Sequence, residues 1–128
     1  MPGGSPYSLN YHVVLARVIP QTIVHLRTIQ GKSAAVGWSG PHTVMIDRSE
    51  QAGGSGIGFN GGEMLLLAIG GCYLNDLYRE AAKRNMDVKS VQVIVKGDWG
   101  GEPPRAQDVS FSVRVEAAAS KGDISDLI

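Results

Sequence analysis

GFNGGEMLLLAIGGC, residues 58–72, is the stretch of the chain that decides its fold. It leads from a glycine-rich loop into a helix that is apolar on nearly all sides, a pattern typical of a helix enclosed by protein. The helical period continues to Asn85, and a helix of about 25 residues would be roughly 37 Å long. Its second half carries charged side chains and is expected to emerge into solvent. The sequence therefore predicts one long central helix that places Cys72, the only cysteine, deep in the protein.

Several strand-like runs precede this helix. Apolar and β-branched residues dominate them, and alternation is clear in the second run. They cover residues 11–19, 22–29, 33–38 and 42–47. Pro20 closes the first run, and turn-forming residues at 30–32 and 39–41 separate the other three. We expect an antiparallel meander here.

Two further strands and a short helix should follow the central helix. The strands cover residues 91–99 and 108–116, with a Gly/Pro loop at 97–107. Alternation in the second strand is clean, and its inward face should hold Val109, Phe111, Val113 and Val115. Ser120 and Asp123 resemble a capping box that begins a second helix. The whole order predicts an α+β fold with antiparallel strands wrapped around a long central helix.

At 128 residues the chain has the length of one domain. We expect residues 1–10 to be a disordered or extended N-terminal segment and residues 11–128 to form a single domain. The second helix would stop at Ile128 after about two turns, which is marginal for an isolated helix. The domain is therefore expected to be incomplete at its C-terminal end.

Composition excludes several classes of function. The chain has 12 basic and 12 acidic residues and no basic stripe, which argues against nucleic-acid binding. Its longest apolar run, residues 64–69, is too short to span a bilayer. The N-terminus lacks the features of a signal peptide, and one cysteine cannot form an intrachain disulfide. We expect a soluble cytoplasmic protein that binds neither nucleic acid nor membrane.

Glycines around the helix start allow two interpretations. Residues 56–61 match G-x-G-x-x-G, but a dinucleotide site needs a strand that leads directly into the glycines, and residues 48–55 intervene. Gly61 and Gly62 leave backbone N–H groups that can bind an anion, although close packing is the favoured explanation. We therefore expect a flexible loop and no bound nucleotide.

A second glycine pair, Gly70-Gly71, lies in the middle of the helix next to Cys72. Each glycine costs about 1 kcal/mol of helix stability relative to alanine. Such a cost beside the only cysteine suggests that another backbone approaches the helix here. Cys72 is thus expected at a packed junction, such as a helix crossing or a subunit interface.

No metal or cofactor is predicted. The histidines lie on predicted strands or at their edges and have no ligand spacing to Cys72; they are His12, His25 and His42. Cys72 itself has two possible roles. A lone buried cysteine is often a small inert hydrophobe, whereas a thiol with a lowered pKa and sufficient exposure is a nucleophile.

Four segments resemble the OsmC/Ohr family, the osmotically induced and organic-hydroperoxide-resistance proteins. They are residues 42–47, 60–72, 81–88 and 91–97, and the order of strands and helices also agrees. The resemblance implies an intertwined homodimer in which curved sheets wrap two central helices. It also implies that Cys72 matches the peroxidatic cysteine, which in peroxidase members forms a sulfenic acid that a second cysteine resolves to a disulfide.

The chain departs from the peroxidase pattern at three points. The second cysteine is absent. The glutamate of the peroxidase branch, ten residues before the cysteine, corresponds to Gly62, while Glu63 is nine residues before it and points to the opposite side of an ideal helix. Glu63 either reaches a partner subunit's site or caps its own helix. Arg27 and Lys32 are the candidates for the family's arginine.

Two hypotheses about function follow. In the first, Cys72, Glu63 and Arg27 form a one-cysteine organic hydroperoxide reductase of the stress response, with a small apolar hydroperoxide as substrate and an external thiol as reductant. In the second, the chain is a non-enzymatic OsmC-like homodimer that binds a small apolar ligand, and Cys72 only fills space. The missing second cysteine favours the second hypothesis, and the Gly-Gly-Cys segment favours the first.

Overall fold

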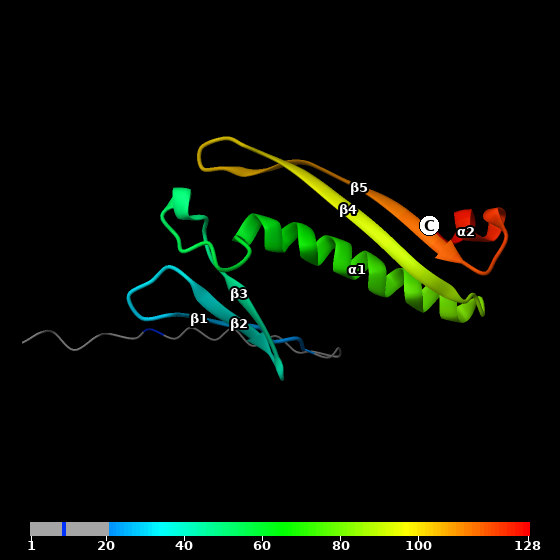
Figure 1. Cartoon of the computed structure of the whole chain (residues 1–128), viewed down its shortest axis with the longest axis horizontal. Coiled ribbons are helices and arrows are strands. Elements are labelled where there is room, and N and C mark those ends of the chain that lie inside the picture. The colour runs from blue at the N-terminus through cyan, green and yellow to red at the C-terminus, as the bar shows by residue number, and fades with distance from the viewer. Residues whose placement is uncertain (1–8, 10–20) are drawn as a thin grey trace, which may run out of the picture.

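The computed structural model describes Leu9 and residues 21–128. In this part, the chain forms two antiparallel sheets and one long helix (Figure 1). The predicted α+β class and the order of elements from residue 22 onward are confirmed. The strand predicted for residues 11–19 and the segment 1–10, apart from Leu9, lie outside the described residues.

The first sheet is a meander of three short strands. They are β1 (His25–Thr28), β2 (Ala35–Ser39) and β3 (His42–Ile46), in the order β1-β2-β3. Gly31 (φ 76°) and Gly40 (φ 55°) occupy the two turns in the left-handed region, where glycine carries no steric cost. His25 and Trp38 are direct cross-strand partners, and their rings stack with centroids 5.1 Å apart. Both predicted turns are thus correct.

The second unit is the long helix α1 (Gly61–Lys83) with the hairpin of β4 (Val88–Gly100) and β5 (Arg105–Ala117), followed by the short helix α2 (Lys121–Leu127). In Figure 1 the hairpin runs along α1, and α2 lies near the C-terminal end of α1. The strands extend further than predicted: much of the expected 97–107 loop is paired, up to Trp99 with Ala106 and Gly100 with Arg105.

Helix α1 packs closely on β4 because glycines and large side chains alternate across the contact. Trp99 covers Gly62, Leu66 covers Gly97, and Val95 lies against Gly70. A Cβ added at Gly70 would lie 3.1 Å from Val95 Cγ2, which is tighter than ordinary packing. Gly71 has open space instead. The expected close approach at the glycine pair is therefore present at Gly70 and comes from side chains of β4.

The hydrophobic core of the described chain is small. Its only cluster of buried side chains is Leu77, Ala81 and Leu127, at the C-terminal end of α1. Partly buried residues pack around it, namely Tyr73, Met86, Val88, Val91, Val113 and Val115. The prediction that the first half of α1 is enclosed is wrong for a single chain, since Leu65 and Leu67 are about half exposed. Described residues cover only one face of the first half of the helix.

The inward face predicted for β5 is only partly covered. Val113 and Val115 pack against the core cluster as expected. Val109 and Phe111 share their face of the strand but remain 42% and 50% exposed. Phe111 contacts Tyr73 at a centroid distance of 5.0 Å. The period was read correctly, but a two-stranded ribbon and one helix do not provide enough protein to bury that face.

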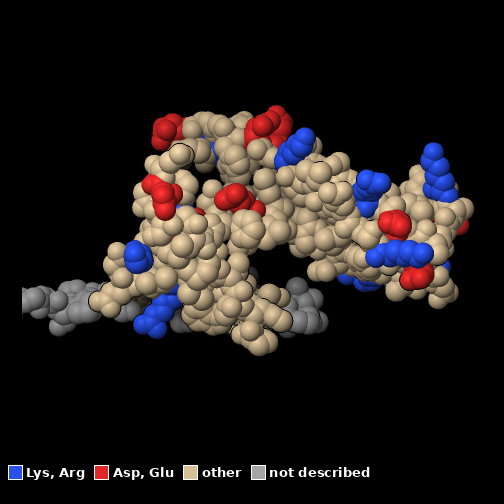
Figure 2. Space-filling view, in the orientation of Figure 1, with Lys and Arg blue, Asp and Glu red and all other residues tan. Residues whose placement is uncertain are grey.

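The β1–β3 sheet and the α1 unit form two lobes joined by residues 47–60. Figure 2 shows that the surface is hollowed between them, and that charged side chains gather over the second half of α1 and around α2. The second half of α1 holds two ion pairs, Arg79 with Asp76 and Lys83 with Glu80. The charged face of this half is largely exposed, as predicted, but its other face carries the buried Leu77 and Ala81, so the half as a whole does not emerge into solvent.

Candidate functional site

Cys72 lies in the middle of α1 and is exposed. The expectation of a deeply placed thiol is therefore wrong for the single chain. The reason is geometric: the face of α1 that meets β4 carries Gly70 and Leu77, and Cys72 points away from it at about 100° per residue. The first half of the helix is apolar on all sides, so its sequence does not reveal which side its own sheet covers.

The surroundings of Cys72 on this face are apolar. Leu65 and Ile69 precede it by two turns and one turn, and Leu65 is 48% exposed. The face becomes polar only at Asp76 and Arg79, which pair with each other. Cys72 therefore sits at the boundary between an uncovered apolar surface and a solvated one. Such a surface suits an apolar partner or ligand.

Glu63 caps its own helix. Its Oε1 accepts a hydrogen bond from the Asn60 backbone N–H (3.0 Å), and Asn60 Oδ1 accepts one from the Glu63 N–H (2.8 Å). This is a complete capping box, which satisfies backbone donors at the first turn. The interpretation of Glu63 as a cap is correct. Within one chain, Glu63 lies about half a turn around the helix from Cys72, so it does not approach the thiol.

At position 62, where the peroxidase branch has glutamate, a side chain would have to displace the Trp99 indole. A Cβ on Gly62 would meet Trp99 Cζ2 at 2.8 Å and Cε2 at 3.2 Å. The indole of Trp99 thus occupies the space of any residue-62 side chain. Gly62 therefore serves close packing, as favoured from the sequence, whereas a Cβ at Gly61 would meet nothing within 4 Å.

Arg27 lies on β1, in the other lobe, and its side chain is exposed. Lys32 follows in the turn after β1 and is also exposed. Neither side chain forms a hydrogen bond or ion pair with another described residue. The three sequence candidates Cys72, Glu63 and Arg27 are therefore placed on three separate surfaces of one chain.

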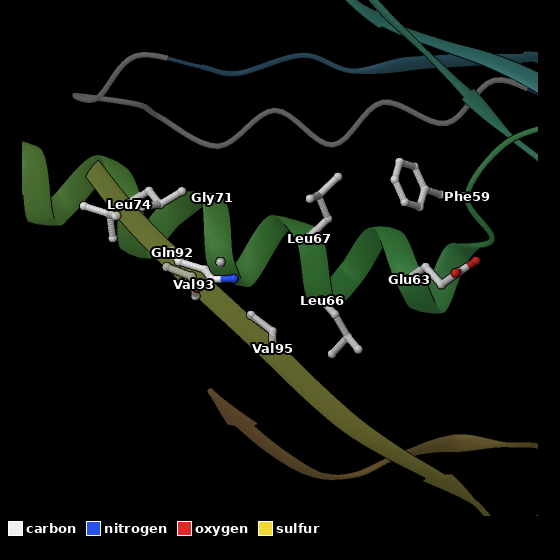
Figure 3. Close-up of a pocket in the computed structure, with 11 residues that line it drawn as sticks. Phe59, Glu63, Leu66, Leu67, Gly71, Leu74, Gln92, Val93 and Val95 are labelled. Carbon is white, nitrogen blue, oxygen red and sulfur yellow. The ribbon is translucent and has the colours of Figure 1, made fainter. Parts of the chain in front are cut away.

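An apolar groove lies on the other side of α1, between the helix and β4 (Figure 3). Its volume is about 640 Å³. Its walls include Phe59, Leu66, Leu67, Leu74, Val93 and Val95, with Glu63 and Gln92 as the polar members. Cys72 does not line it. The groove and the thiol are two distinct features.

Asp47 is a buried residue that the sequence interpretation did not single out. It follows β3, is 2% exposed, and accepts hydrogen bonds from the backbone N–H groups of Arg48, Ser55 and Ile57. An aspartate at the end of a strand, before a glycine-rich loop, is the available sequence signal, because Asp side chains bond to nearby backbone in turns. Its role is structural within one chain.

Comparison with known proteins identifies the family. The family model described as OsmC-like protein matches residues 53–128, which include α1, the β4–β5 hairpin and α2. The chain belongs to the OsmC-like family. No curated protein matches it.

Solved structures agree with this OsmC-like fold. One is a protein of Psychrobacter arcticus 273-4 assigned to the osmotic stress induced and detoxification response, with a TM-score of 0.70 and 15% identity over 89% of this chain and 82% of its own. Another is an OsmC like protein from Mycoplasma pneumoniae, with a TM-score of 0.71 and 14% identity over 84% and 77%. At these identities the likeness shows the fold alone.

Two searches of the described residues found no site of another kind. No helix among them is long and apolar enough to cross a membrane. No group of three or more His, Cys, Asp or Glu side chains in residues 21–128 is arranged to hold a metal ion.

Proposed function

We propose that this OsmC-like chain works as an intertwined homodimer. Two apolar surfaces have no covering layer among the described residues: the α1 face that carries Leu65 and Cys72, and the β1–β3 sheet, where Leu26 and Val44 are exposed. A helix face and a sheet each need another layer to bury them. A second copy supplies both layers at once, since each copy brings one helix and one sheet.

We further propose that the dimer is a one-cysteine organic hydroperoxide reductase. The observation that carries this proposal is the exposed Cys72 thiol on an apolar, uncovered stretch of α1. A second copy laid over this stretch would enclose the thiol among apolar side chains. That environment fits a small apolar hydroperoxide better than hydrogen peroxide.

The reaction has two stages. The Cys72 thiolate attacks the distal oxygen of the hydroperoxide, so that an S–O bond forms as the O–O bond breaks. The alkoxide leaves and takes a proton to become an alcohol, and Cys72 becomes a sulfenic acid. An external thiol then attacks this sulfur, water leaves, and a mixed disulfide forms. A second thiol releases reduced Cys72, and the two external thiols end as a disulfide.

Arg27 and Glu63 contribute to this site only if they come from the second copy. Both lie away from Cys72 in their own chain. A guanidinium near the thiol would favour the reactive thiolate. One oxygen of Glu63 is used by the helix cap, so Glu63 would act through its other oxygen. Arg27→Lys would retain the charge and lose the planar fork.

The alternative is a non-enzymatic dimer that binds a small apolar ligand. It is favoured by the Trp99 indole at position 62, which leaves no room for the glutamate of the peroxidase branch. The groove beside β4 offers such a ligand about 640 Å³ of mostly apolar space. Under this alternative, Cys72 only packs against the second copy.

Turnover of cumene hydroperoxide by the reduced protein distinguishes the two functions. The assay is run with dithiothreitol and separately with a dihydrolipoyl donor, and a carbon nucleophile traps any sulfenic acid for mass spectrometry. The peroxidase proposal predicts turnover together with a trapped adduct on Cys72. No turnover and an unmodified Cys72 would leave the non-enzymatic dimer.

A relocated thiol is the matched control. Cys72→Ser removes the only thiol, and the double variant Cys72→Ser/Ser112→Cys restores one thiol on the exposed outer face of β5. We expect both to lose turnover while sedimentation still reports a dimer. Equal turnover by the relocated thiol would mean that any exposed thiol suffices, and that α1 provides no site.

A further inference from the structure

Asp47 is the one buried charged side chain among residues 21–128. Its Oδ1 accepts the Arg48 N–H at 2.7 Å, and its Oδ2 accepts the N–H groups of Ser55 (3.0 Å) and Ile57 (3.2 Å). No described Lys or Arg side chain forms an ion pair with it. Among the described residues, backbone N–H groups alone therefore stabilise this carboxylate, and the carboxylate in turn orders the loop that carries those N–H groups.

The loop that Asp47 holds is compact. The Gly54 N–H donates to Ser49 O (2.9 Å), and the Gly56 N–H donates to Arg48 O (3.0 Å). Gly54 fits so tightly that a Cβ there would lie 2.1 Å from the Arg48 oxygen. Gly58 is similarly tight against Met45. These glycines let the backbone fold onto itself, so the predicted flexible loop is a structured connector.

This connector joins the two lobes. Its first residue, Asp47, pairs back with its end, because the Asp47 N–H donates to Phe59 O at 2.9 Å. The next residue, Asn60, caps α1. The path from β3 to the first turn of α1 is thus a closed loop (Figure 1), because Ile46 and Asp47 at its start pair with Phe59 at its end.

We propose that Asp47 is a positioning residue that fixes the direction of the β1–β3 sheet relative to α1 by bonding the Arg48, Ser55 and Ile57 amides. Without the carboxylate, the loop opens and the two lobes move independently, while each keeps its own fold. This inference goes beyond the proposed function, because it needs neither peroxide chemistry nor a dimer.

The hydrogen bonds that the Asp47 carboxylate accepts depend on pH in a defined direction. Burial alone would raise the pKa of Asp47, but the hydrogen bonds from the Arg48, Ile57 and Ser55 amides outweigh burial and lower the pKa below the usual 3.8. The charged side chains nearest in sequence, Arg48 and Glu50, are exposed and do not contact it. A lowered pKa means that the stabilisation is complete above about pH 4 and is lost as pH falls through the lower, folded-state value.

Amide hydrogen exchange tests whether the carboxylate holds the loop. Asp47→Asn keeps the shape but leaves one acceptor oxygen, so it cannot accept from Arg48 and from the Ser55 and Ile57 pair at the same time. We expect exchange of the amides that lose their acceptor, either Arg48 or Ser55 and Ile57, to rise by about tenfold or more. Glu50→Gln removes a charge from the same loop and should leave all three amides unchanged. Equal exchange in wild-type and Asp47→Asn would overturn the proposal.

Spin labels test whether the loop sets the lobe geometry. One label sits on the native Cys72 in α1 and one on Thr43→Cys in β3, with excess unlabelled protein so that distances within one chain dominate. Asp47→Asn should broaden the distance distribution, and wild-type should broaden only below about pH 4. Faster amide exchange without broadening would show that Asp47 orders the loop but does not position the lobes. The pH series needs the labelled Thr43→Cys protein but no change at Asp47, so it remains informative if Asp47→Asn fails to fold.

Discussion

The two faces of α1 have similar composition and opposite surroundings. On one face, Gly70 and Leu77 lie against β4 and the core cluster. On the opposite face, Leu65 and Cys72 are exposed over the same stretch of helix. Leucine and glycine occur on both. Apolar sequence therefore marks a surface that must be buried, but it does not say whether the same chain or another molecule buries it.

The glycines separate the two faces more clearly than the leucines do. Gly62, Gly70 and Gly97 are explained within the chain, because each accepts a large side chain of the facing element. Gly71 is not explained in this way. Its cost to the helix has no counterpart among the described residues, so alanine should be the better residue there unless another molecule packs against it.

A substitution on the face of α1 that β4 and the core cluster cover should have the largest effect on stability. Leu77→Ala removes a side chain that is 3% exposed and packs with Ala81 and Leu127. We expect a loss of about 2–5 kcal/mol in the free energy of unfolding, since the cavity adds to the lost burial. Urea unfolding checks this through a lower midpoint with an unchanged slope. A loss below about 1 kcal/mol would mean that this cluster is not the core.

A substitution on the uncovered face of α1 should have an intermediate effect on stability, and this effect should depend on protein concentration. In a monomer, Leu65→Ala would change stability by no more than about 0.5 kcal/mol, because Leu65 is 48% exposed. In the proposed dimer it loses buried area worth about 1.5–3 kcal/mol. Thermal unfolding at two protein concentrations a hundredfold apart separates these cases, because only an obligate dimer has a midpoint that rises with concentration. A midpoint independent of concentration would contradict the dimer.

Most of the fold could be predicted from the sequence because its signals are local. The turns at Gly31 and Gly40, the helix from Gly61 and the cap at Ser120 follow from turn chemistry, periodicity and capping. The family was also predicted and is confirmed by the match to residues 53–128. The extent of β4 and β5 was underestimated, because the Gly/Pro composition of residues 97–107 hides a paired hairpin end.

The candidate site was less predictable, because it depends on contacts between distant residues. That Glu63 caps α1 was one of two open interpretations, and only the geometry of Asn60 decides it. The exposure of Cys72 depends on which face β4 covers, which periodicity cannot show in an all-apolar segment. The catalytic roles of Cys72, Glu63 and Arg27 stay predictions. Asp47 was missed because its partners, Ser55 and Ile57, are backbone groups that carry no sequence signature.

The smallest expected change in the free energy of unfolding comes from alanine substitutions at the two adjacent glycines, Gly70 and Gly71. Gly71→Ala should gain about 1 kcal/mol, since alanine is the better helix former and the new Cβ meets nothing within 4 Å. Gly70→Ala gains the same helix propensity, but its Cβ would lie 3.1 Å from Val95 Cγ2, so we expect overpacking to reverse the sign. Urea unfolding of both variants measures the difference, and each is the control for the other.

The sign of the stability change in Gly71→Ala also tests whether another molecule fills the groove beside β4, because Gly71 lines this groove. If Gly71→Ala is stabilising at every protein concentration, the position is open in the working molecule and nothing packs tightly there. If it is destabilising, and more so at high concentration, where the wild type is dimeric, then a second copy contacts the backbone at Gly71. A loss that does not depend on concentration would instead mean that Gly71 packs within its own chain, contrary to the geometry described.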